Sequence, residues 1–316
     1  MNHIKTDGIN MNPVMVSIHC LVYNQAPYLR QCLDGFVNQK TKFKFEAIVH
    51  DDVSIDGSRD IIKEYAQKYP DIIKPVFETE NQYSKNDGSL EKSMFPYLRG
   101  KYMAICEGDD YWTDPYKLQK QFNILEGNDA VELCYTRSKV FYEDKQSFAN
   151  YLNADKGPTD FVSIMFKEPA ITLTSFFRTK SYKDYWNDIQ PGTKGWLMGD
   201  TPLFLWLSHK GSVVLLDDVT AVYRMLGESA SHSSNIEKQL RFNKSTLDIR
   251  LYFCEKYGRN DLISALYDTY FRSNMYDAYR NSPFKLFFEN FNQIKHKSYR
   301  DYIYLLSHIK HCILNR

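Results

Sequence analysis

The feature that most constrains the fold is a regular alternation of short apolar runs and helical segments in the first third of the chain. The apolar runs, rich in β-branched residues, span 14–22, 45–50, 72–77 and 102–106. Between them, apolar side chains recur at the spacing of an amphipathic helix. Strands that alternate with helices form βαβ units, so we predict an α/β fold whose mostly parallel central sheet is flanked by helices.

The rest of the chain continues this pattern less regularly and then becomes helical. A helix is predicted to begin after Pro115 and to reach about Glu126. Asp217 and Asp218 are expected in a turn at the end of a strand. The remaining predicted elements are strands over 131–141, 170–177 and 213–216, a polar loop over 142–160, and helices from about 236 onward.

Composition excludes several classes of protein. With 316 residues and 43% hydrophobic content, the chain can form one large domain or one domain with an appendage. A formal net charge of +1 gives no indication of a nucleic-acid partner. The six cysteines show no C-x-x-C spacing, which argues against a zinc site or a disulfide framework and favours free thiols in a reducing cytoplasm.

The N-terminal segment and the hydropathy of the chain predict a protein that does not cross a membrane. Residues 1–13 are polar and have no apolar core of the kind found in signal peptides, so we expect them to form a tail. No apolar run approaches the roughly 18 residues that a spanning helix needs. We therefore predict a cytoplasmic protein that is either soluble or peripherally attached to the inner face of the membrane.

Three carboxylates in four residues follow the fourth apolar run directly. Glu107, Asp109 and Asp110 stand at its carboxyl end. Burying unpaired charges costs several kcal/mol each, so such a cluster calls for a compensating cation, most often a divalent metal with oxygen ligands. An open α/β sheet also binds its ligand at the carboxyl ends of its strands. The alternative interpretation is a solvated acidic turn.

Glycine-rich phosphate loops are absent from the sequence. Neither G-x-G-x-x-G nor G-x-x-x-x-G-K-[ST] occurs, which excludes Rossmann dehydrogenases and P-loop enzymes. Polar or acidic residues nevertheless end each predicted strand, and such residues are the expected rim of a nucleotide or phosphate site.

Four motifs occur in an order that resembles one known family. They are Val16-Ser17-Ile18 leading to Tyr23-Asn24, the stretch from Asp51 to Ser58, the stretch from Glu107 to Asp110, and Gly199-Asp200 with Tyr223-Arg224 downstream. Together they resemble the inverting family-2 glycosyltransferases of the GT-A fold, of the kind found in bacterial polysaccharide and lipopolysaccharide synthesis. The resemblance covers about 14–232. Two positions depart from the family's pattern. Glu107 stands where the D-x-D-D box has its first aspartate, and the first strand ends in His19-Cys20, where the family usually has an apolar residue and a proline.

The resemblance implies a particular domain organisation. It implies a Rossmann-like GT-A domain over 14–235 with a mostly parallel sheet, followed by a helical C-terminal extension over 236–316. The tail, residues 1–13, would precede both.

The resemblance also implies a site for a nucleotide-sugar donor. Residues matching Tyr23 and Asn24 flank the base and ribose in the family, and a carboxylate matching Asp51 or Asp52 accepts the base's N–H. A carboxylate paired with an imide donor makes a charge-assisted hydrogen bond, which favours uracil or thymine. The alternative role for this segment is helix capping, and Ser54 or Asp56 is expected to cap the following helix. His19, in the first strand, is expected to be a packed side chain.

A divalent cation, Mn²⁺ or Mg²⁺, is the cofactor that the resemblance implies. Asp109 and Asp110 match the metal and ribose contacts of the family. Glu107 is one methylene longer than the family's aspartate, and it is predicted to reach either a ribose hydroxyl or a water on the metal. His232 lies where some GT-A enzymes place a third metal or diphosphate contact, although a lone histidine in a polar loop is more often a bystander.

Asp200 matches the position of the family's general base. An in-line displacement requires the acceptor hydroxyl to lose its proton, and a carboxylate within reach contributes roughly 10²–10⁴-fold. The alternative is that Asp200 caps the helix that follows it. Trp196 is expected either to stack on an acceptor sugar or to anchor its loop in the core. Arg224 is expected to contact a phosphate or the acceptor.

The C-terminal region is basic and amphipathic. Residues 281–316 carry six basic and two acidic side chains, and their apolar residues follow helical spacing. Such helices lie on anionic membranes or pack on protein, and membrane docking would suit a lipid-linked acceptor.

The resemblance thus implies an inverting, metal-assisted transfer of a sugar from a nucleotide-diphosphate sugar, with UDP favoured, to a glycan or lipid-linked acceptor. A sugar-1-phosphate nucleotidyltransferase is a rival, but it would need a Gly-rich basic loop after the first strand, which 23–27 does not offer. A non-catalytic carbohydrate-binding or scaffold protein is a second rival. It would be expected to lose a carboxylate, whereas Asp109, Asp110 and Asp200 are all present.

Overall fold

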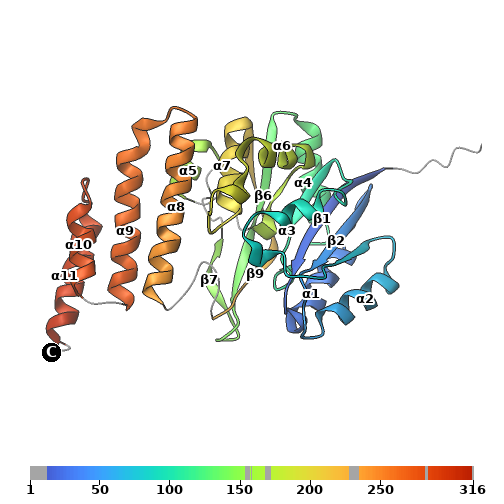
Figure 1. Cartoon of the computed structure of the whole chain (residues 1–316), viewed down its shortest axis with the longest axis horizontal. Coiled ribbons are helices and arrows are strands. Elements are labelled where there is room, and N and C mark those ends of the chain that lie inside the picture. Colours follow the sequence, from blue (N-terminus) through green and yellow to red (C-terminus); the bar gives the residue numbers. More distant parts are fainter. Residues whose placement is uncertain are drawn as a thin grey trace, which may run out of the picture.

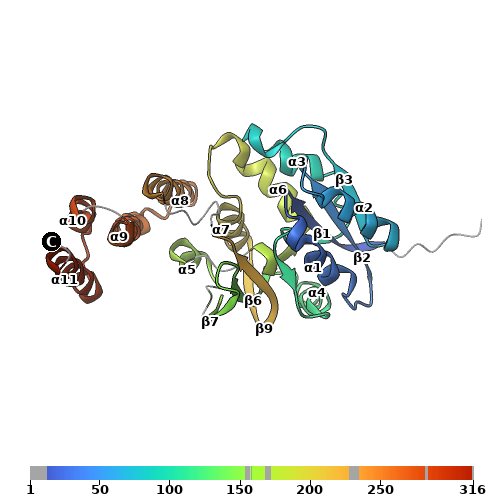
Figure 2. The ribbon, with the colours of Figure 1, turned by 90° about the horizontal axis from the view of Figure 1, so that it is seen from below.

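The structure is a computed structural model, and it describes residues 13–153, 157, 159–167, 172–227, 235–281 and 284–314. Helices cover both faces of a central sheet, and a row of further helices extends from one side of it (Figures 1 and 2). This arrangement confirms the predicted α/β architecture with a helical C-terminal region.

Four strands from the first third of the chain form a parallel half-sheet. They are β1 (Val14–Val22), β2 (Lys44–Asp51), β3 (Ile73–Phe77) and β4 (Tyr102–Ile105), in the spatial order β3-β2-β1-β4. All three pairings among them are parallel. Their carboxyl ends therefore meet at one edge, which brings the turns that follow β1, β2 and β4 together.

The other half of the sheet is mixed. β8 (Phe176–Arg178) pairs antiparallel with β4, and β6 (Val131–Tyr142) pairs antiparallel with β8 and parallel with β9 (Ser212–Met225). β9 also pairs with β5 (Tyr111–Trp112), and β6 also pairs with the hairpin strand β7 (Ser147–Asn153). Because β5 follows the acidic cluster and pairs with β9, residues far apart in sequence meet beside that cluster.

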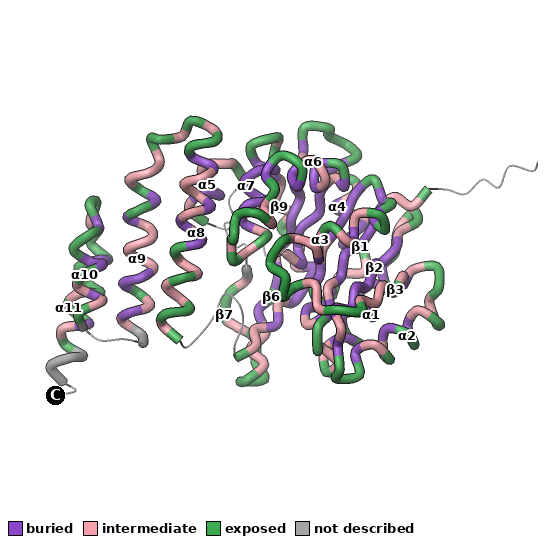
Figure 3. The backbone as a smooth tube through the Cα atoms, in the orientation of Figure 1, coloured by how far each residue is buried: buried purple, intermediate pink, exposed green. Residues whose placement is uncertain are grey.

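Two apolar cores fill the space between the sheet and its helices. One contains Leu29 and Phe36, and the other contains Tyr182 and Phe204, all nearly or fully buried. Figure 3 shows the buried backbone concentrated in the strands and on the inner sides of the helices. The flanking helices are α1 (Ala26–Val37), α2 (Ser58–Lys68), α3 (Ser89–Met94), α4 (Lys117–Gly127), α5 (Phe161–Phe166), α6 (Thr179–Ile189) and α7 (Asp200–Lys210).

The C-terminal helices differ in how they are held. They are α8 (Ile236–Lys256), α9 (Ile263–Asn281), α10 (Phe284–Gln293) and α11 (Tyr299–Leu314), side by side in Figure 1. Buried side chains of α8, and Leu266 of α9, belong to the same core as α6 and α7. The second half of α9 and α10 form a separate small core with Leu305 of α11. Among the described residues, no helix is long and apolar enough to cross a membrane.

Three predictions about the second half of the chain were wrong. The polar loop predicted over 142–160 contains β7, because this segment pairs with β6. The strand predicted over 170–177 is, in its described part, a 3-10 turn (Thr172–Thr174) followed by the short strand β8. Asp217 and Asp218 lie inside β9 and not in a terminal turn, since β9 continues along β6 through a register shift at their position.

Candidate active site

The floor of the site is the turn that follows β4. The backbone N–H of Gly108 donates to the carbonyl oxygen of Leu21 at 3.0 Å, so the turn is tied to the end of β1. A Cβ at Gly108 would lie 2.6 Å from Oε1 of Gln25 and 3.1 Å from Cγ2 of Val22. A larger residue would therefore displace the side chain of Gln25 and press on Val22, so glycine at this position keeps Glu107 and Asp109 close to the turn after β1.

The carboxylates of this turn repel one another in a partly dry environment. The surrounding protein, and then the charges of Asp109 and Asp200, raise the pKa of Glu107 above its ordinary value. Glu107 is nevertheless exposed, so solvent weakens this effect. Burial likewise raises the pKa of Asp109 and, more strongly, that of Asp110. Bringing a cation to the turn would relieve this cost.

Asp109 has the atom best suited to such a cation. Its Oδ1 is buried and has no hydrogen-bond partner within the described part of the chain. No three His, Cys, Asp or Glu side chains of the described residues converge as a complete metal-binding group. A single carboxylate oxygen is compatible with a divalent cation such as Mg²⁺, which usually binds only one or two protein carboxylates and takes its other ligands from phosphate and water.

Asp110 and Arg224 form a clamp on this turn. Oδ1 of Asp110 accepts a hydrogen bond from the backbone N–H of Arg224 at 2.7 Å, and the Arg224 Nε donates to the carbonyl oxygen of Asp109 at 2.8 Å. Two other guanidinium nitrogens donate to Glu143 and Gln31. All three side-chain nitrogens of Arg224 therefore donate to protein atoms. Its predicted contact with a phosphate or an acceptor stays a prediction.

The turns after β1 and β2 are locked together. Oγ of Ser54 accepts from the backbone N–H of Asn24, and Oδ1 of Asn24 accepts from the backbone N–H of Ile55, both at 2.9 Å. Ser54 therefore supports the start of α1 and does not cap α2, whose N-cap is Gly57 with no side-chain cap bond. Asp56 accepts from the backbone N–H groups of both Ala26 and Ser58.

The closeness of these two turns requires unusual backbone conformations. Asn24 has φ 53° and Val53 has φ 67°, both in the left-handed region. A β-branched residue there is strained, which is a common property of binding loops. The exposed ring of Tyr23 extends from the first of these turns.

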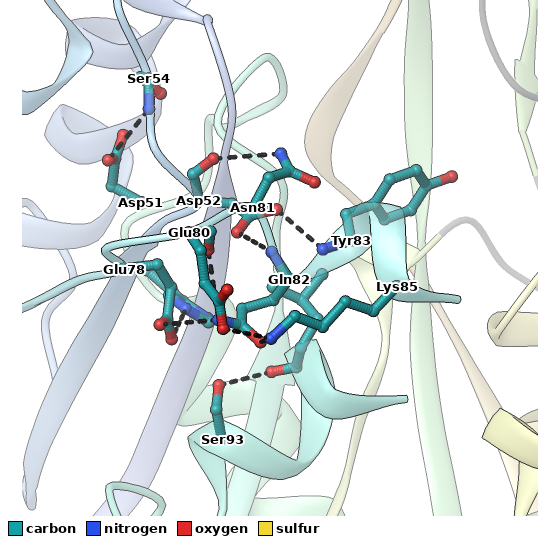
Figure 4. A network of polar contacts seen from close by, with 12 residues as sticks. Asp51, Asp52, Ser54, Glu78, Glu80, Asn81, Gln82, Tyr83, Lys85 and Ser93 are labelled. Atoms are coloured by element: carbon teal, nitrogen blue, oxygen red, sulfur yellow. Dashed lines mark hydrogen bonds and ion pairs between the residues drawn. The ribbon is translucent and has the colours of Figure 1, made fainter. Parts of the chain in front are cut away.

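Asp51 and Asp52 are both buried but have different partners. Oδ2 of Asp51 accepts from the Arg59 side chain at 2.5 Å, and Oδ1 of Asp51 is without a hydrogen-bond partner among the described residues. Asp52 uses both oxygens to accept from the backbone N–H groups of Gln82 and Tyr83, at 2.7 and 3.0 Å (Figure 4). Asp52 thus fixes the loop after β3 next to the residues predicted to bind the nucleobase of the donor.

Asp200 lies at the start of α7, a helix that packs in the core containing Tyr182 and Phe204. The N-cap of α7 is Gly199, and Asp200 is the first residue inside the helix. The alternative that Asp200 is the N-cap is therefore wrong. Oδ1 of Asp200 accepts from the backbone N–H of Thr201 at 2.7 Å. Its charge is close enough to act on Glu107. The fold therefore places Asp200 within range of the charge of Glu107, although the two residues lie far apart in the sequence.

The remaining predicted residues have mixed outcomes. Trp196 is half-buried, with its ring against Tyr252 and Phe253 at centroid distances of 5.3 and 6.3 Å, so it serves at least as an anchor on α8. His232 lies outside the described residues. His19 is confirmed as a packed side chain, since it is 2% exposed.

Sequence reasoning did not identify three residues of the site. Gln25 contacts Gly108 across the two turns, and its Oε1 is buried without a partner in the described chain. Gln25 directly follows Tyr23-Asn24, so its position was a usable signal. Gln31 and Glu143 gave no such signal, because they approach the acidic turn only through Arg224.

Comparison with known proteins identifies the family. Residues 17–186, more than half of the chain, match the family described as glycosyl transferase family 2. The chain belongs to this family, as the motif order predicted.

Sequence relatives agree with this assignment. An uncharacterized protein of Mycobacterium tuberculosis is 32% identical over 71% of this chain, but the match spans only 62% of that relative's length. An uncharacterized glycosyltransferase of Nostoc is 28% identical over 48% of this chain and 45% of its own.

Two solved structures show the same fold. S. aureus TarS in complex with UDP-GlcNAc aligns with a TM-score of 0.56 at 14% identity, covering 86% of this chain and 83% of that one. The Pyrobaculum calidifontis mannosyltransferase PcManGT, in complex with GDP-Man and Mn²⁺, aligns with a TM-score of 0.57 at 13% identity over 95% and 82%. The GT-A fold is thereby confirmed.

Proposed function

We propose that the protein is an inverting glycosyltransferase that moves a sugar from a nucleotide-diphosphate sugar to a glycan or lipid-linked acceptor. The observation that carries this proposal is that two groups from distant parts of the sequence lie within range of each other's charge. One is the acidic turn with the unpartnered Oδ1 of Asp109 (among the described residues), and the other is Asp200 on α7. The first suits a diphosphate and its cation, and the second suits removal of a proton from the acceptor.

The donor would lie across the turns after β1, β2 and β4. Tyr23 and Asn24 would flank the base and ribose, and the buried pair Asp51 and Asp52 would supply the carboxylate that accepts the base's N–H. Oδ1 of Asp51, which has no partner in the described chain, supports this assignment. Glu107, which keeps solvent contact beside Asp109, would reach the ribose or a water.

Asp109 would hold a divalent cation, Mn²⁺ or Mg²⁺, with Asp110 fixing the turn behind it. When bound, the cation neutralises the diphosphate and acts as a Lewis acid as charge develops on the leaving group. The complex of PcManGT with GDP-Man and Mn²⁺ supports a divalent metal.

Asp200 would accept the proton of the attacking hydroxyl, on the opposite side of the sugar from the departing diphosphate. One in-line displacement then inverts the anomeric centre. The position of Asp200 at the start of α7 holds its carboxylate on a rigid element, and Trp196 lies just before this helix. Trp196 would border the acceptor.

The donor is proposed to be UDP-linked, and the reaction to be hexosyl or N-acetylhexosaminyl transfer in surface polysaccharide synthesis. The complex of TarS with UDP-GlcNAc supports this choice, while the GDP-Man complex of PcManGT marks the main competitor. A carboxylate such as Asp51 or Asp52 can accept an N–H from either uracil or guanine, so binding measurements with UDP-sugars and GDP-sugars decide between the two donors.

Peripheral contact with the inner face of the membrane is proposed for α11. This helix exposes Tyr299, Ile303 and Leu306, which are 81%, 44% and 66% exposed, together with the basic residues Arg300 and Lys310. A face of this composition suits the interface of an anionic membrane and would bring the enzyme to a lipid-linked acceptor.

A thermal-shift screen of nucleotide sugars and free nucleotides, with and without Mn²⁺, tests the proposal. A ligand that binds the folded state raises the melting temperature by mass action. We expect UDP and a UDP-sugar to stabilise the protein, and Mn²⁺ to increase the effect. No shift with any nucleoside diphosphate, with or without Mn²⁺, would contradict the proposed function.

A further inference from the structure

Arg224 is a highly connected side chain beside the acidic turn. It is 8% exposed, and its guanidinium lies over the rings of Tyr28 and Tyr111 at 4.7 and 5.3 Å from their centroids. Its three side-chain nitrogens donate to the Asp109 carbonyl oxygen, to Glu143 and to Gln31. Three separate parts of the chain therefore converge on this one residue.

The clamp acts on the turn from both the main chain and the side chain of Arg224. The backbone N–H of Arg224 occupies Oδ1 of Asp110, while its Nε holds the carbonyl oxygen of Asp109. The Arg224 side chain thus fixes the backbone of Asp109. Oδ1 of Asp109 has no hydrogen-bond partner among the described residues, so this oxygen can bind a ligand. A turn of like charges would otherwise spread apart, because its carboxylates repel one another.

We propose that Arg224 is a positioning residue that holds the Glu107–Asp110 turn in the conformation that binds the cation, and that Glu143 and Gln31 hold Arg224 in place. This inference rests on the proposed function. It assigns Arg224 no contact with phosphate or acceptor. Glu143, between β6 and β7, accepts from the Arg224 Nη1 at 2.6 Å, and Gln31 of α1 accepts from Nη2 at 2.7 Å.

The main test compares Arg224→Lys with Arg99→Lys. Both changes keep a positive charge and lose the planar fork of donors. Arg99 is a suitable control because it binds the buried Glu46, near the start of β2 and away from the acidic turn. For each variant, the Kd of Mn²⁺ is measured by electron paramagnetic resonance with UDP or GDP present. The Kd of the same nucleotide in EDTA and the melting temperature are also measured.

We expect Arg224→Lys to raise the Kd of Mn²⁺ by roughly 10–100-fold, the range found for residues that orient metal ligands. The Kd of the nucleotide in EDTA should not change, and Arg99→Lys should change neither constant. Wild-type affinity for Mn²⁺ in Arg224→Lys would overturn the inference. So would an equal weakening of nucleotide binding in EDTA, because that result would mean direct contact with the ligand.

Gln31→Ala and Glu143→Gln keep the inference testable if Arg224→Lys does not fold. Each should raise the Kd of Mn²⁺ in the same direction by a smaller factor, and wild-type affinity in both would overturn the clamp. A wild-type protein that binds nucleotide but no Mn²⁺ would refute the clamp and the metal assignment together. A wild-type protein that binds neither would instead refute the proposed function.

Discussion

At the scale of single residues, the site is defined by carboxylates in unlike surroundings. Asp52 is satisfied by two backbone N–H groups, whereas Oδ1 of Asp109 is buried without a partner among the described residues. The same residue type therefore supports a loop in one place and suits a cation in the other. Asp200, at the start of α7, has a third environment, next to the charge of Glu107.

Replacing Asp200 with asparagine should abolish transfer and leave donor binding nearly intact. Asparagine keeps the size of the side chain but cannot accept a proton at neutral pH, so turnover should fall by about 10²–10⁴-fold. Turnover and donor affinity would be measured on the same preparation, with Asp184→Asn on α6 as a control. Turnover near the wild-type rate in Asp200→Asn would show that another group is the base.

The buried His19 should make stability depend on pH. Burial, and then the charge of His50, lower the pKa of His19 to about 3, while the unfolded chain keeps the ordinary value of 6.5. Below pH 6.5 the unfolded state binds a proton that the folded state does not, so stability falls as pH falls toward 3. Compared with the wild type, His19→Leu should lose about 2 kcal/mol less between roughly pH 7 and pH 4.5.

Urea denaturation of both proteins at about pH 7, 5.5 and 4.5 checks this prediction. The free energies of unfolding should converge or cross in favour of His19→Leu as the pH falls. Parallel pH profiles for the two proteins would show that His19 does not contribute to acid sensitivity.

At the scale of elements, the turns that end parallel strands build the site. The turn after β4 reaches the end of β1 through the Gly108 N–H, and a Cβ at this position would press on the side chains of Gln25 and Val22. The spacing of apolar residues predicted β1 to β4 well, because each strand is a short run of mostly apolar residues. It did not predict β7, whose residues alternate too weakly to be distinguished from a polar loop.

Gly108→Ala should damage the site by crowding its neighbours. The added Cβ would lie 2.6 Å from Oε1 of Gln25 and 3.1 Å from Cγ2 of Val22, so the Gln25 side chain must move and the packing against Val22 must loosen. We expect a loss of about 1–3 kcal/mol in stability and weaker binding of UDP with Mn²⁺. Gly127→Ala, at the end of α4, is the matched control, because a Cβ there meets no described atom within 4 Å. Equal behaviour of the two variants in calorimetry would contradict this explanation.

At the scale of the whole molecule, the GT-A domain and the helical region are not cleanly separated. Leu247, Ile249, Phe253 and Cys254 of α8 are at most 3% exposed and belong to the core that contains α6 and α7. The backbone N–H of Leu197 also donates to the α8 residue Ser245 at 2.9 Å. The predicted boundary at 235 therefore stays a prediction that truncation can test.

A chain that ends at residue 235 should not fold, whereas one that ends at residue 281 should. The first truncation removes the buried side chains of α8, each worth about 1.5–3 kcal/mol, and their sum is comparable to the whole stability of a domain. The second removes α10 and α11, which pack in a separate core with α9. Circular dichroism melting curves would compare the two, and cooperative unfolding of the shorter chain would support the boundary at 235.

The sequence by itself determined the parallel strands of the first half, the acidic turn and the motif order, because these depend on short-range patterns of apolar and polar residues. The tertiary structure decided what those patterns cannot express. It placed Asp200 near Glu107, moved Ser54 from capping α2 to supporting α1, and made Arg224 a clamp on Asp109. Each of these contacts joins residues that lie far apart in the chain, so it follows from strand pairing and packing and not from local spacing.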